Sequence, residues 1–279
     1  MTKTFYTLLS TLILQVLIII PASSQVEDLA ASTGRITIII QPVFNGQPLK
    51  LTDQNYVNDH GDTLYIDVFK FYLTHVSLNL SSIGGIKHSD SLEIRKAFLF
   101  DAENSKENSF SADILNPGKV SRISFTLGVD SIDNTSGANE GDLDPINAMY
   151  WAWNSGYIMA KLEGHSSVCH TLHHAFEFHI GGYMPPYNTA RTVHLDLPQP
   201  ITVKSGENTV IKINADVAAW FRGNLDLSKR NSVVIPGKEA SLMADNYAPC
   251  LSNCRLIPMA FLPLMGLLCL PARLYFYKW

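Results

Sequence analysis

The run from Asp62 to Leu80, DTLYIDVFKFYLTHVSLNL, decides the fold class of this chain. Bulky apolar residues occupy alternate positions from Phe69 to Leu73 and again from Val76 to Leu80. Alternation with a period of two is typical of a β-strand that buries one face. Near Thr74 the alternation changes from odd to even positions, so we predict a bulge or bend there. The run therefore predicts one long strand with an irregularity near its middle.

Similar short β-rich runs continue along most of the chain. Gly, Pro, Asn and Asp residues bound them, and helical patterns are confined to Asp216–Phe221 and Lys238–Tyr247. Many short strands separated by such turns are typical of sandwiches and barrels. We expect an all-β fold, an antiparallel β-sandwich with a few short helical turns. The other predicted strands are Arg35–Phe44, Lys96–Asp101, Val120–Val129, Tyr157–Glu163, Phe176–Ile180, Thr192–Leu197 and Thr209–Ala215.

Residues 1–24 have the composition of a secretory signal peptide. Lys3 precedes the apolar run Leu8–Ile20, and the small residues Ala22 and Ser24 provide a cleavage site. We therefore expect a periplasmic or extracellular protein after the signal peptide is removed. No repeat or linker interrupts residues 35–248, so we predict that they form one domain.

Residues 249–279 form an atypical tail that is rich in apolar residues, Cys and Pro. Leu256–Ala272 carries no charge, but it contains prolines and is short for a membrane span. Three alternatives stay open for this tail: a C-terminal membrane anchor, a buried final segment, and an ending that is not native. Of these, the anchor is not the favoured interpretation.

The four cysteines are unevenly distributed. Cys169 stands alone in the middle of the chain, whereas Cys250, Cys254 and Cys269 lie in the tail. An oxidising compartment permits a disulfide between Cys250 and Cys254 or between Cys169 and the tail. The sequence does not choose between these pairings.

Composition and motifs argue against several classes of function. The net charge is −4, and the chain has no basic stripe, so nucleic acid is not an expected partner. No H-E-x-x-H, G-x-S-x-G, Walker or dinucleotide-binding motif occurs. Asp130–Pro145 is acidic but lacks the EF-hand spacing, so it predicts a solvated loop rather than a calcium site. We expect a protein that is not itself an enzyme.

The stretch Met149–Tyr157, MYWAWNSGY, is the most distinctive part of the sequence. If it is extended, Met149, Trp151 and Trp153 share one face. Two interpretations are open. The indoles fill a hydrophobic layer of the core, or they form an oxidisable wall of a binding site.

Histidines are the candidate metal ligands. His179 lies inside the apolar run Phe176–Ile180, so it is either a core histidine or a ligand. The histidines between residues 170 and 174 are either ligands or exposed loop residues. Imidazole binds copper, zinc and nickel, and oxidisable neighbours favour copper. A carboxylate such as Glu177 could orient a ligating imidazole.

Four segments together resemble the MbnP-like family. They are FKFYLTHVSL (Phe69–Leu78), FTLGVDSIDNTSGANEGDLDPINAMYWAWNSGYIMAKLEG (Phe125–Gly164), FEFHIGG (Phe176–Gly182) and MADNYA (Met243–Ala248). The resemblance extends over Arg35–Tyr247. The chain departs from the family's pattern at His75, where a small polar residue is usual, and in the apolar tail.

The resemblance implies a secreted or periplasmic protein that is linked to copper handling. Relatives bind copper through imidazoles and through a tryptophan oxidised to kynurenine, and a diheme partner of the MauG type carries out that oxidation. The motif match implies His179 as a ligand, His165 as a second ligand, and Trp151 or Trp153 as the candidate for modification. This hypothesis requires an imidazole and an indole to lie close together.

A carbohydrate-binding or adhesion sandwich at the cell surface is the alternative function. Trp151, Trp153, Tyr157 and Tyr183 would then stack on sugar rings. Exposure separates the two hypotheses, because a lectin needs indoles that face solvent, whereas a copper site needs an indole beside an imidazole.

Overall fold

The computed structural model describes residues 33–252 apart from 82–90, 95–96, 105–107, 116–117, 155 and 224. Of residues 91–94 and 252 it describes the backbone only. The predicted signal peptide, Cys254 and Cys269 therefore lie outside the described residues. Within the described part of the chain, no helix is long and apolar enough to span a membrane.

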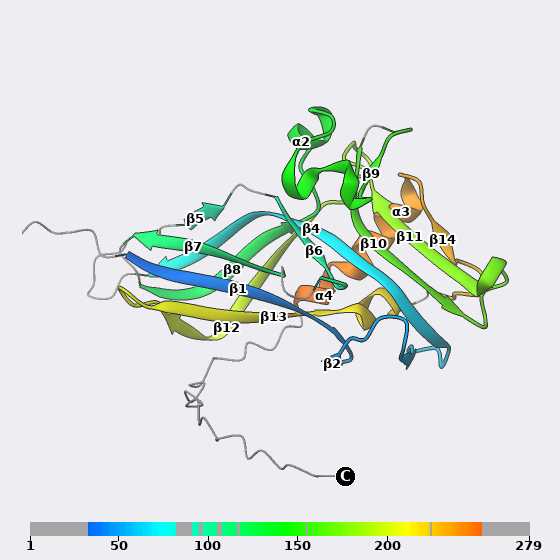
Figure 1. Ribbon diagram of the computed structural model, residues 1–279, viewed down its shortest axis with the longest axis horizontal. Helices are drawn as coiled ribbons and strands as arrows, with labels where there is room; N and C mark the ends of the chain where they lie inside the picture. The colour runs from blue at the N-terminus through cyan, green and yellow to red at the C-terminus, as the bar shows by residue number, and fades with distance from the viewer. Residues whose placement is uncertain are drawn as a thin grey trace, which may run out of the picture. The chain divides into compact units, whose positions relative to one another are not determined.

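Strands dominate the described residues, and helical elements are short (Figure 1). The strands are β1 (Thr33–Phe44), β2 (Gln47–Pro48), β3 (Asn55–Val57), β4 (Thr63–Ser81), β5 (Ser91–Ile94), β6 (Phe98–Asp101), β7 (Ser109–Leu115), β8 (Lys119–Leu127), β9 (Tyr150–Trp151), β10 (Gly156–Ser166), β11 (Ala175–Gly181), β12 (Arg191–Thr202), β13 (Asn208–Asp216) and β14 (Ser232–Val233). The α-helices are α2 (Ser131–Thr135), α3 (Lys238–Tyr247) and α4 (Pro249–Ser252), and the 3-10 helices are η1 (Gly141–Leu143), η2 (Pro145–Asn147), η3 (Leu172–His174) and η4 (Val217–Phe221). The predicted all-β sandwich with a few short helical turns is confirmed.

The strands form a smaller and a larger sheet. In the smaller sheet β1 lies between β13 on one side and β2 and β7 on the other. In the larger sheet the order is β12-β8-β4-β10-β11-β14. Most pairs are antiparallel as expected, but β1 pairs with β13 in parallel, and so does β11 with β14. Alternation tells which face of a strand is buried and not the direction of its neighbour, so the sequence did not reveal these parallel pairs.

The long strand β4 lies in the middle of the larger sheet, between β8 and β10. Its register with β8 shifts between Thr74 and Ser77, where β4 has one residue more than its partner. His75 takes up the extra length in a left-handed conformation with φ of 50°. The predicted bulge near Thr74 is confirmed, and it keeps apolar side chains on the core face along both halves of the strand.

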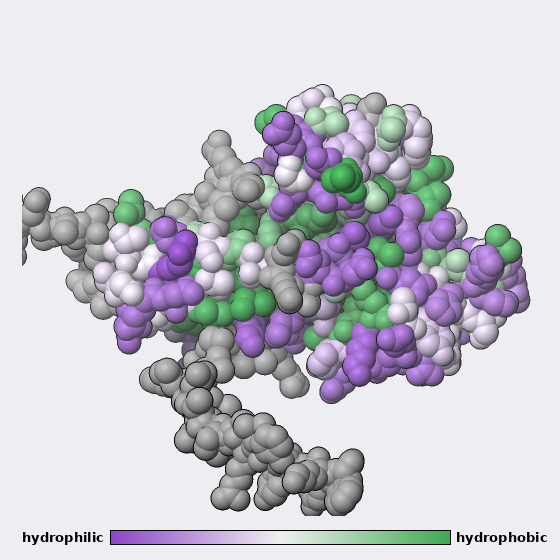
Figure 2. All heavy atoms as spheres, in the orientation of Figure 1, coloured by the Kyte–Doolittle hydropathy of each residue, from purple (hydrophilic) through white to green (hydrophobic). Residues whose placement is uncertain are grey.

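One hydrophobic core joins the inner faces of both sheets. Ile36, Ile38 and Ile40 of β1 are buried in the same cluster as Phe69 and Phe71 of β4. A fully buried side chain of this size contributes about 1.5–3 kcal/mol by leaving water. On the face shown in Figure 2, hydrophilic residues cover much of the described surface and hydrophobic residues form smaller areas.

The core also takes in the helices that follow β13. Trp220 of η4 is fully buried and stacks on Tyr247 of α3, with ring centroids 5.0 Å apart. Cys250 and Leu251 of α4 are buried in the same cluster. The packed core therefore continues to at least residue 251, beyond the predicted end of the domain at 248.

A second, smaller apolar cluster lies on the other side of the larger sheet. It includes Tyr72 of β4 together with Met149, Trp151, Tyr157 and Ile158. Figure 1 shows α2 on the opposite side of β4 from β1. The segment between β8 and β9, which contributes Val129, Leu143 and Met149 to this cluster, therefore covers an area of the sheet that would otherwise face water.

The predicted solvated loop Asp130–Pro145 is only partly correct. It contains α2, η1 and the start of η2, and both Leu143 and Asn134 are buried. Asp130 accepts a hydrogen bond from the backbone N–H of Asp133, and Asp144 accepts one from Ile146. Two of the acidic side chains therefore cap helical turns, which explains them without a calcium ion.

Gly164 of β10 allows the closest packing between β10 and its neighbours. A Cβ there would overlap the carbonyl oxygen of Tyr65 and lie 2.5 Å from the Phe176 ring.

We expect Gly164→Ala to lower the free energy of unfolding by about 3 kcal/mol, because the backbone of β10 or β4 must move to make room for the methyl group. Urea unfolding measures the loss. Gly156→Ala on the same strand is the control, since its nearest contact would be an ordinary 3.4 Å. Equal stability of the two variants would contradict the expected overlap.

Candidate functional site

The candidate site lies on the outer face of the larger sheet, where β4, β10 and β11 are neighbours. Leu162 and Gly164 of β10 point to the core, so Lys161, Glu163 and His165 alternate with them on the outer face. On β11, His179 and Gly181 alternate with the buried Ile180 in the same way. One face of two paired strands thus carries both histidines that the motif match implies.

Glu163 is the centre of a three-residue charged group. Its Oε1 lies 2.7 Å from Nε2 of His179 and 3.0 Å from Nζ of Lys161. His179 is the register partner of Lys161, so Glu163 reaches His179 diagonally across the ladder. The hydrogen bond from His179, together with Lys161, lowers the pKa of Glu163 to about 2 against the opposing effect of burial. Glu163 is therefore ionised throughout the physiological range.

This contact determines how the imidazole of His179 is held. An ionised carboxylate only accepts hydrogen bonds, so Nε2 of His179 carries a hydrogen and donates it to Glu163. In the neutral ring Nδ1 then keeps its lone pair. Metal-binding histidines commonly have one ring nitrogen fixed by a carboxylate in this manner. Glu177, considered from the sequence for this role, is exposed and is the register partner of Glu163.

Trp151 lies on the same face of the sheet, over Gly181, which is two positions after His179 on β11. A Cβ on Gly181 would meet Cζ3 of Trp151 at 2.6 Å, so the indole lies directly over the backbone of Gly181. Residues 179 and 181 point to the same side of β11 and are about 7 Å apart along the strand. The indole therefore lies over the position two residues beyond His179 on the same face, and the absence of a side chain at Gly181 makes room for it.

Trp153 has a different environment from Trp151. Only Tyr150–Trp151 is extended, and the chain turns directly afterwards. Met149 and Trp151 are 0% and 6% exposed, whereas Trp153 is 65% exposed. The condition for one shared face, an extended chain as far as residue 153, therefore does not hold, because the chain turns after Trp151. The ring of Trp153 still lies 5.6 Å from that of Trp151, measured between centroids.

His165 forms a separate group further along β10. Its Nδ1 is 3.0 Å from Oδ2 of Asp67, and its ring stacks on Tyr65 at 4.7 Å between centroids. Asp67 is an extra residue of β4, because the register with β10 shifts between Glu163 and Gly164. His165 is opposite Ala175, four positions from His179, which corresponds to about 13 Å along the ladder. The structure thus places the two predicted ligands with different carboxylate partners.

The other histidines singled out from the sequence, all of them in the described part of the chain, do not join this group. His170, His173 and His174 are exposed at η3, as the loop interpretation predicted. His75 lies 3.4 Å from Asp130, the residue that caps α2. Within the residues that the structure describes, no three His, Cys, Asp or Glu side chains are grouped as they would be around a metal ion.

Cys169 is a buried free thiol in the main core. Burial raises the pKa of this thiol, so it stays protonated at neutral pH. Its Sγ lies 3.8 Å from the carbonyl oxygen of Leu227. Cys169 and Cys250 are not joined to each other in the structure, and every disulfide alternative that involves Cys254 or Cys269 falls outside the described residues.

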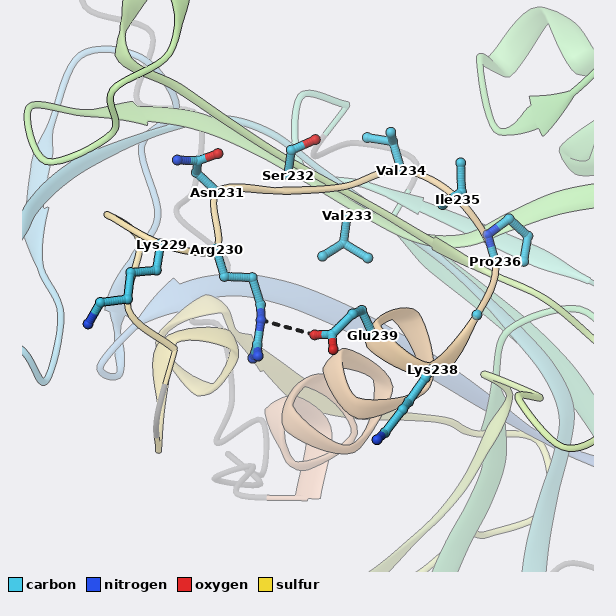
Figure 3. A pocket seen from close by; sticks show the side chains of 11 residues that line it. Lys229, Arg230, Asn231, Ser232, Val233, Val234, Ile235, Pro236, Lys238 and Glu239 are labelled. Carbon is cyan, nitrogen blue, oxygen red and sulfur yellow. Dashed lines mark ion pairs between the residues drawn. The ribbon is translucent and has the colours of Figure 1, made fainter.

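A pocket near α3 is formed by other residues. It has a volume of about 580 Å³ and is lined by residues 229–239, which lead from the loop after η4 into α3. Figure 3 shows Val233 pointing into this space and an ion pair between Arg230 and Glu239, whose atoms are 3.0 Å apart. None of the histidines or tryptophans predicted as site residues lines it.

Comparison with known proteins identifies the family. A profile of the MbnP family matches residues 33–236, so the chain belongs to that family. Among solved structures, MbnP from Methylosinus trichosporium is similar, with 11% sequence identity and a TM-score of 0.42. The similarity covers 75% of this chain and 82% of that one. No curated protein matches this chain.

Sequence reasoning missed Glu163 as the partner of His179. The motif KLEGH (161–165) alternates charged residues with an apolar residue and a glycine, and that pattern places Lys161, Glu163 and His165 on one face of a strand. It could have indicated a charged row. It could not have paired Glu163 with His179, because that contact depends on the register of β10 with β11.

Glu163→Gln should make stability less dependent on pH. A carboxylate whose pKa is lower in the folded state than in the unfolded state stabilises the fold at pH values above the unfolded pKa, here 4.5. This stabilisation is lost as the pH falls from 4.5 to the folded pKa of about 2. At pH 6 we expect a loss of about 2 kcal/mol, and the gap to the unsubstituted protein should close between pH 4.5 and 2. Urea unfolding across that range measures it. Glu177→Gln, an exposed neighbour, should change stability by less than about 0.5 kcal/mol. A constant gap at all pH values would refute the assigned role of Glu163.

Proposed function

We propose that this chain is an extracytoplasmic copper-binding protein, with His179 as a ligand and Trp151 as the aromatic group beside it. Membership of the MbnP family supports the class of protein. The observation that carries the proposal is the placement of His179 and of the Trp151 indole, which covers Gly181 two positions further along β11, on one face of the sheet. The predicted signal sequence supports a location outside the cytoplasm.

The donor chemistry of these residues fits copper in its reduced form. Copper(I) accepts imidazole and soft donors at low coordination number, so it needs few protein ligands. Nδ1 of His179 is the nitrogen left for the metal once Nε2 is bound to Glu163. His165, the second ligand that the motif match implies, has Nδ1 bound to Asp67 and lies about 13 Å along the ladder from His179, so the proposal does not require both imidazoles on one ion. Glu163 and Asp67 would each hold one imidazole in place.

Of the two tryptophans, Trp151 is the better candidate for oxidation to kynurenine. It lies over Gly181, two positions after His179 on β11, whereas Trp153 faces solvent. Oxidative cleavage of the indole C2–C3 bond by two equivalents of peroxide at the partner's hemes would release two waters and leave a formyl amide and a ketone. Hydrolysis would then remove C2 as formate and leave an arylamine and the ketone beside His179. A diheme partner of the MauG type is the proposed oxidant. In this proposal the chain binds the metal and does not itself catalyse a reaction.

The sugar-binding alternative loses part of its proposed surface. Trp151 and Tyr157 are 6% and 1% exposed, so neither can stack on a sugar ring. Tyr157 instead donates a hydrogen bond to the carbonyl oxygen of Leu143 at 2.8 Å. Only Trp153 and Tyr183 of the four aromatic residues remain available to such a ligand.

His179→Ala tests the proposed ligand. The full chain from its native host, loaded with copper(I) without oxygen, should hold about one ion, and the variant should hold almost none. Elemental analysis after gel filtration counts the copper. His173→Ala is the matched control, because His173 is exposed at η3 and should not affect binding. Glu163→Gln should weaken the affinity by about 10- to 100-fold, as the loss of a ligand's carboxylate partner commonly does.

Two results would count against this proposal. Equal copper content of His179→Ala and the unsubstituted protein would remove His179 as a ligand. Mass spectrometry of the peptide that contains both tryptophans tests the modification. A mass change that persists in Trp151→Phe and disappears in Trp153→Phe would assign the oxidised residue to the surface position instead.

A further inference from the structure

A second pocket lies where three loops meet beyond the ends of β9 and β11. Asn154 comes from the turn after β9, Tyr183, Met184 and Tyr187 come from the loop after β11, and Pro236 precedes α3. Its volume of about 310 Å³ is at the lower end of the range for small-molecule sites, about 300–1,000 Å³. None of the residues identified as copper ligands or as the modified tryptophan lines it.

The lining of this pocket has no charged side chain. It offers flat aromatic and proline surfaces, with Met184 63% and Tyr187 43% exposed, together with the amide of Asn154. Trp153, the residue before Asn154, is also exposed. Large apolar groups held in water at a concave site indicate a binding surface. Its occupant should be uncharged, with an apolar face for stacking and polar groups for the amide.

The loop that presents Tyr187 is fixed from within. The backbone N–H and the hydroxyl of Thr189 both donate to the carbonyl of Gly182, at 2.8 Å and 3.1 Å, and Thr189 is fully buried. The N–H of Tyr187 donates to the carbonyl of Met184 at 3.2 Å. The guanidinium of Arg191 donates a hydrogen bond to the carbonyl oxygen of Asn188 at 2.8 Å. The aromatic surface is therefore organised before a ligand arrives, which reduces the entropy lost on binding.

The floor of the pocket is closed by packing between two of its segments. A Cβ on Gly182 would lie 3.2 Å from Cβ of Pro236 and 3.3 Å from the carbonyl oxygen of Tyr187. Gly182 has φ of 124°, a conformation that L side chains rarely adopt. The loop after β11 thus turns sharply at Gly182, against the segment before α3.

We propose that this pocket binds a neutral saccharide, with one sugar ring stacked on Tyr187 and its hydroxyl groups bonded to Asn154 and Tyr183. A sugar ring has an apolar face of C–H groups and a rim of hydroxyls, which matches the aromatic surface and the single amide. A charged ligand would find no counter-charge among the lining residues. Trp153 extends the stacking surface beyond the pocket for a second ring.

This saccharide site is separate from the copper site proposed above, although the two are neighbours. Gly181 lies under Trp151, and the next residue, Gly182, lines the pocket. The saccharide proposal uses Tyr187 and Asn154, and the copper proposal uses His179 and Trp151. Loss of one activity therefore need not remove the other.

Saturation-transfer NMR on the full chain tests the proposal with three neutral probes, cellopentaose, maltopentaose and chitotetraose. We expect saturation transfer to ring protons of at least one probe. Tyr187→Ala and Trp153→Ala should each weaken binding by about tenfold, as loss of a stacked ring does. Ile146→Ala is the matched control, because Ile146 is 86% exposed on η2 and does not line the pocket. His179→Ala should bind the same sugar with unchanged affinity, which keeps this test independent of copper.

Absence of transfer to all three probes would overturn the proposal. So would transfer that Tyr187→Ala leaves unchanged, since the sugar would then bind elsewhere. Binding of a proline-rich peptide that is lost in Tyr187→Ala, with no binding of any sugar, would assign the pocket to a different ligand class and would also overturn it. Thermal unfolding of each variant shows whether a loss of binding reflects a loss of fold.

Discussion

The antiparallel pairing of β10 with β11 is the constraint on which the candidate site depends. Its register puts His179 opposite Lys161 and within reach of Glu163, and it leaves Gly181 beneath Trp151. A slip by one residue would turn His179 into the core and Phe178 out to solvent. The register is held on the buried face, where Phe176, Phe178 and Ile180 pack in the main core. The geometry of the polar face is therefore a consequence of apolar packing on the opposite face.

The larger sheet is used on both faces, and this distinguishes it from a simple two-layer sandwich. One face closes the main core, while the other carries the charged group and the second apolar cluster around Tyr72, Trp151 and Tyr157. Two bulges in β4 help to form these faces, one on the core side and one on the polar side. The extra residue at His75 keeps the core face continuous, and the extra residue at Asp67 brings a carboxylate to His165. Local irregularities of one strand thus place polar groups without disturbing the core beneath them.

Two tryptophans that are two residues apart end in opposite environments. Trp151 is enclosed between Gly181 and the second cluster, and Trp153 stands in solvent near an uncharged pocket. The short hairpin between β9 and β10 produces this separation, because only Tyr150 and Trp151 pair with β10 before the chain turns. An inner indole suits chemistry beside an imidazole, and an outer indole suits contact with a ligand or partner. One short motif therefore serves the copper site and the neighbouring saccharide pocket that we propose.

The sequence by itself determined eight strands, the bulge near Thr74, and the helix at Lys238–Tyr247, because these follow from local alternation and propensity along one segment. It did not predict β7 or the short strands β2, β3, β5 and β14. Its resemblance to the family also marked His179 and His165 as ligands and Trp151 or Trp153 for modification, without choosing between the two tryptophans. Only the tertiary structure decided that β1 and β13 run in parallel, that Glu163 and not Glu177 holds His179, and that His165 has a separate partner in Asp67. Alternation fixes which side a residue faces. Which residue lies beside it depends on strand order, register and bulges, and these are set by packing between segments far apart in the chain.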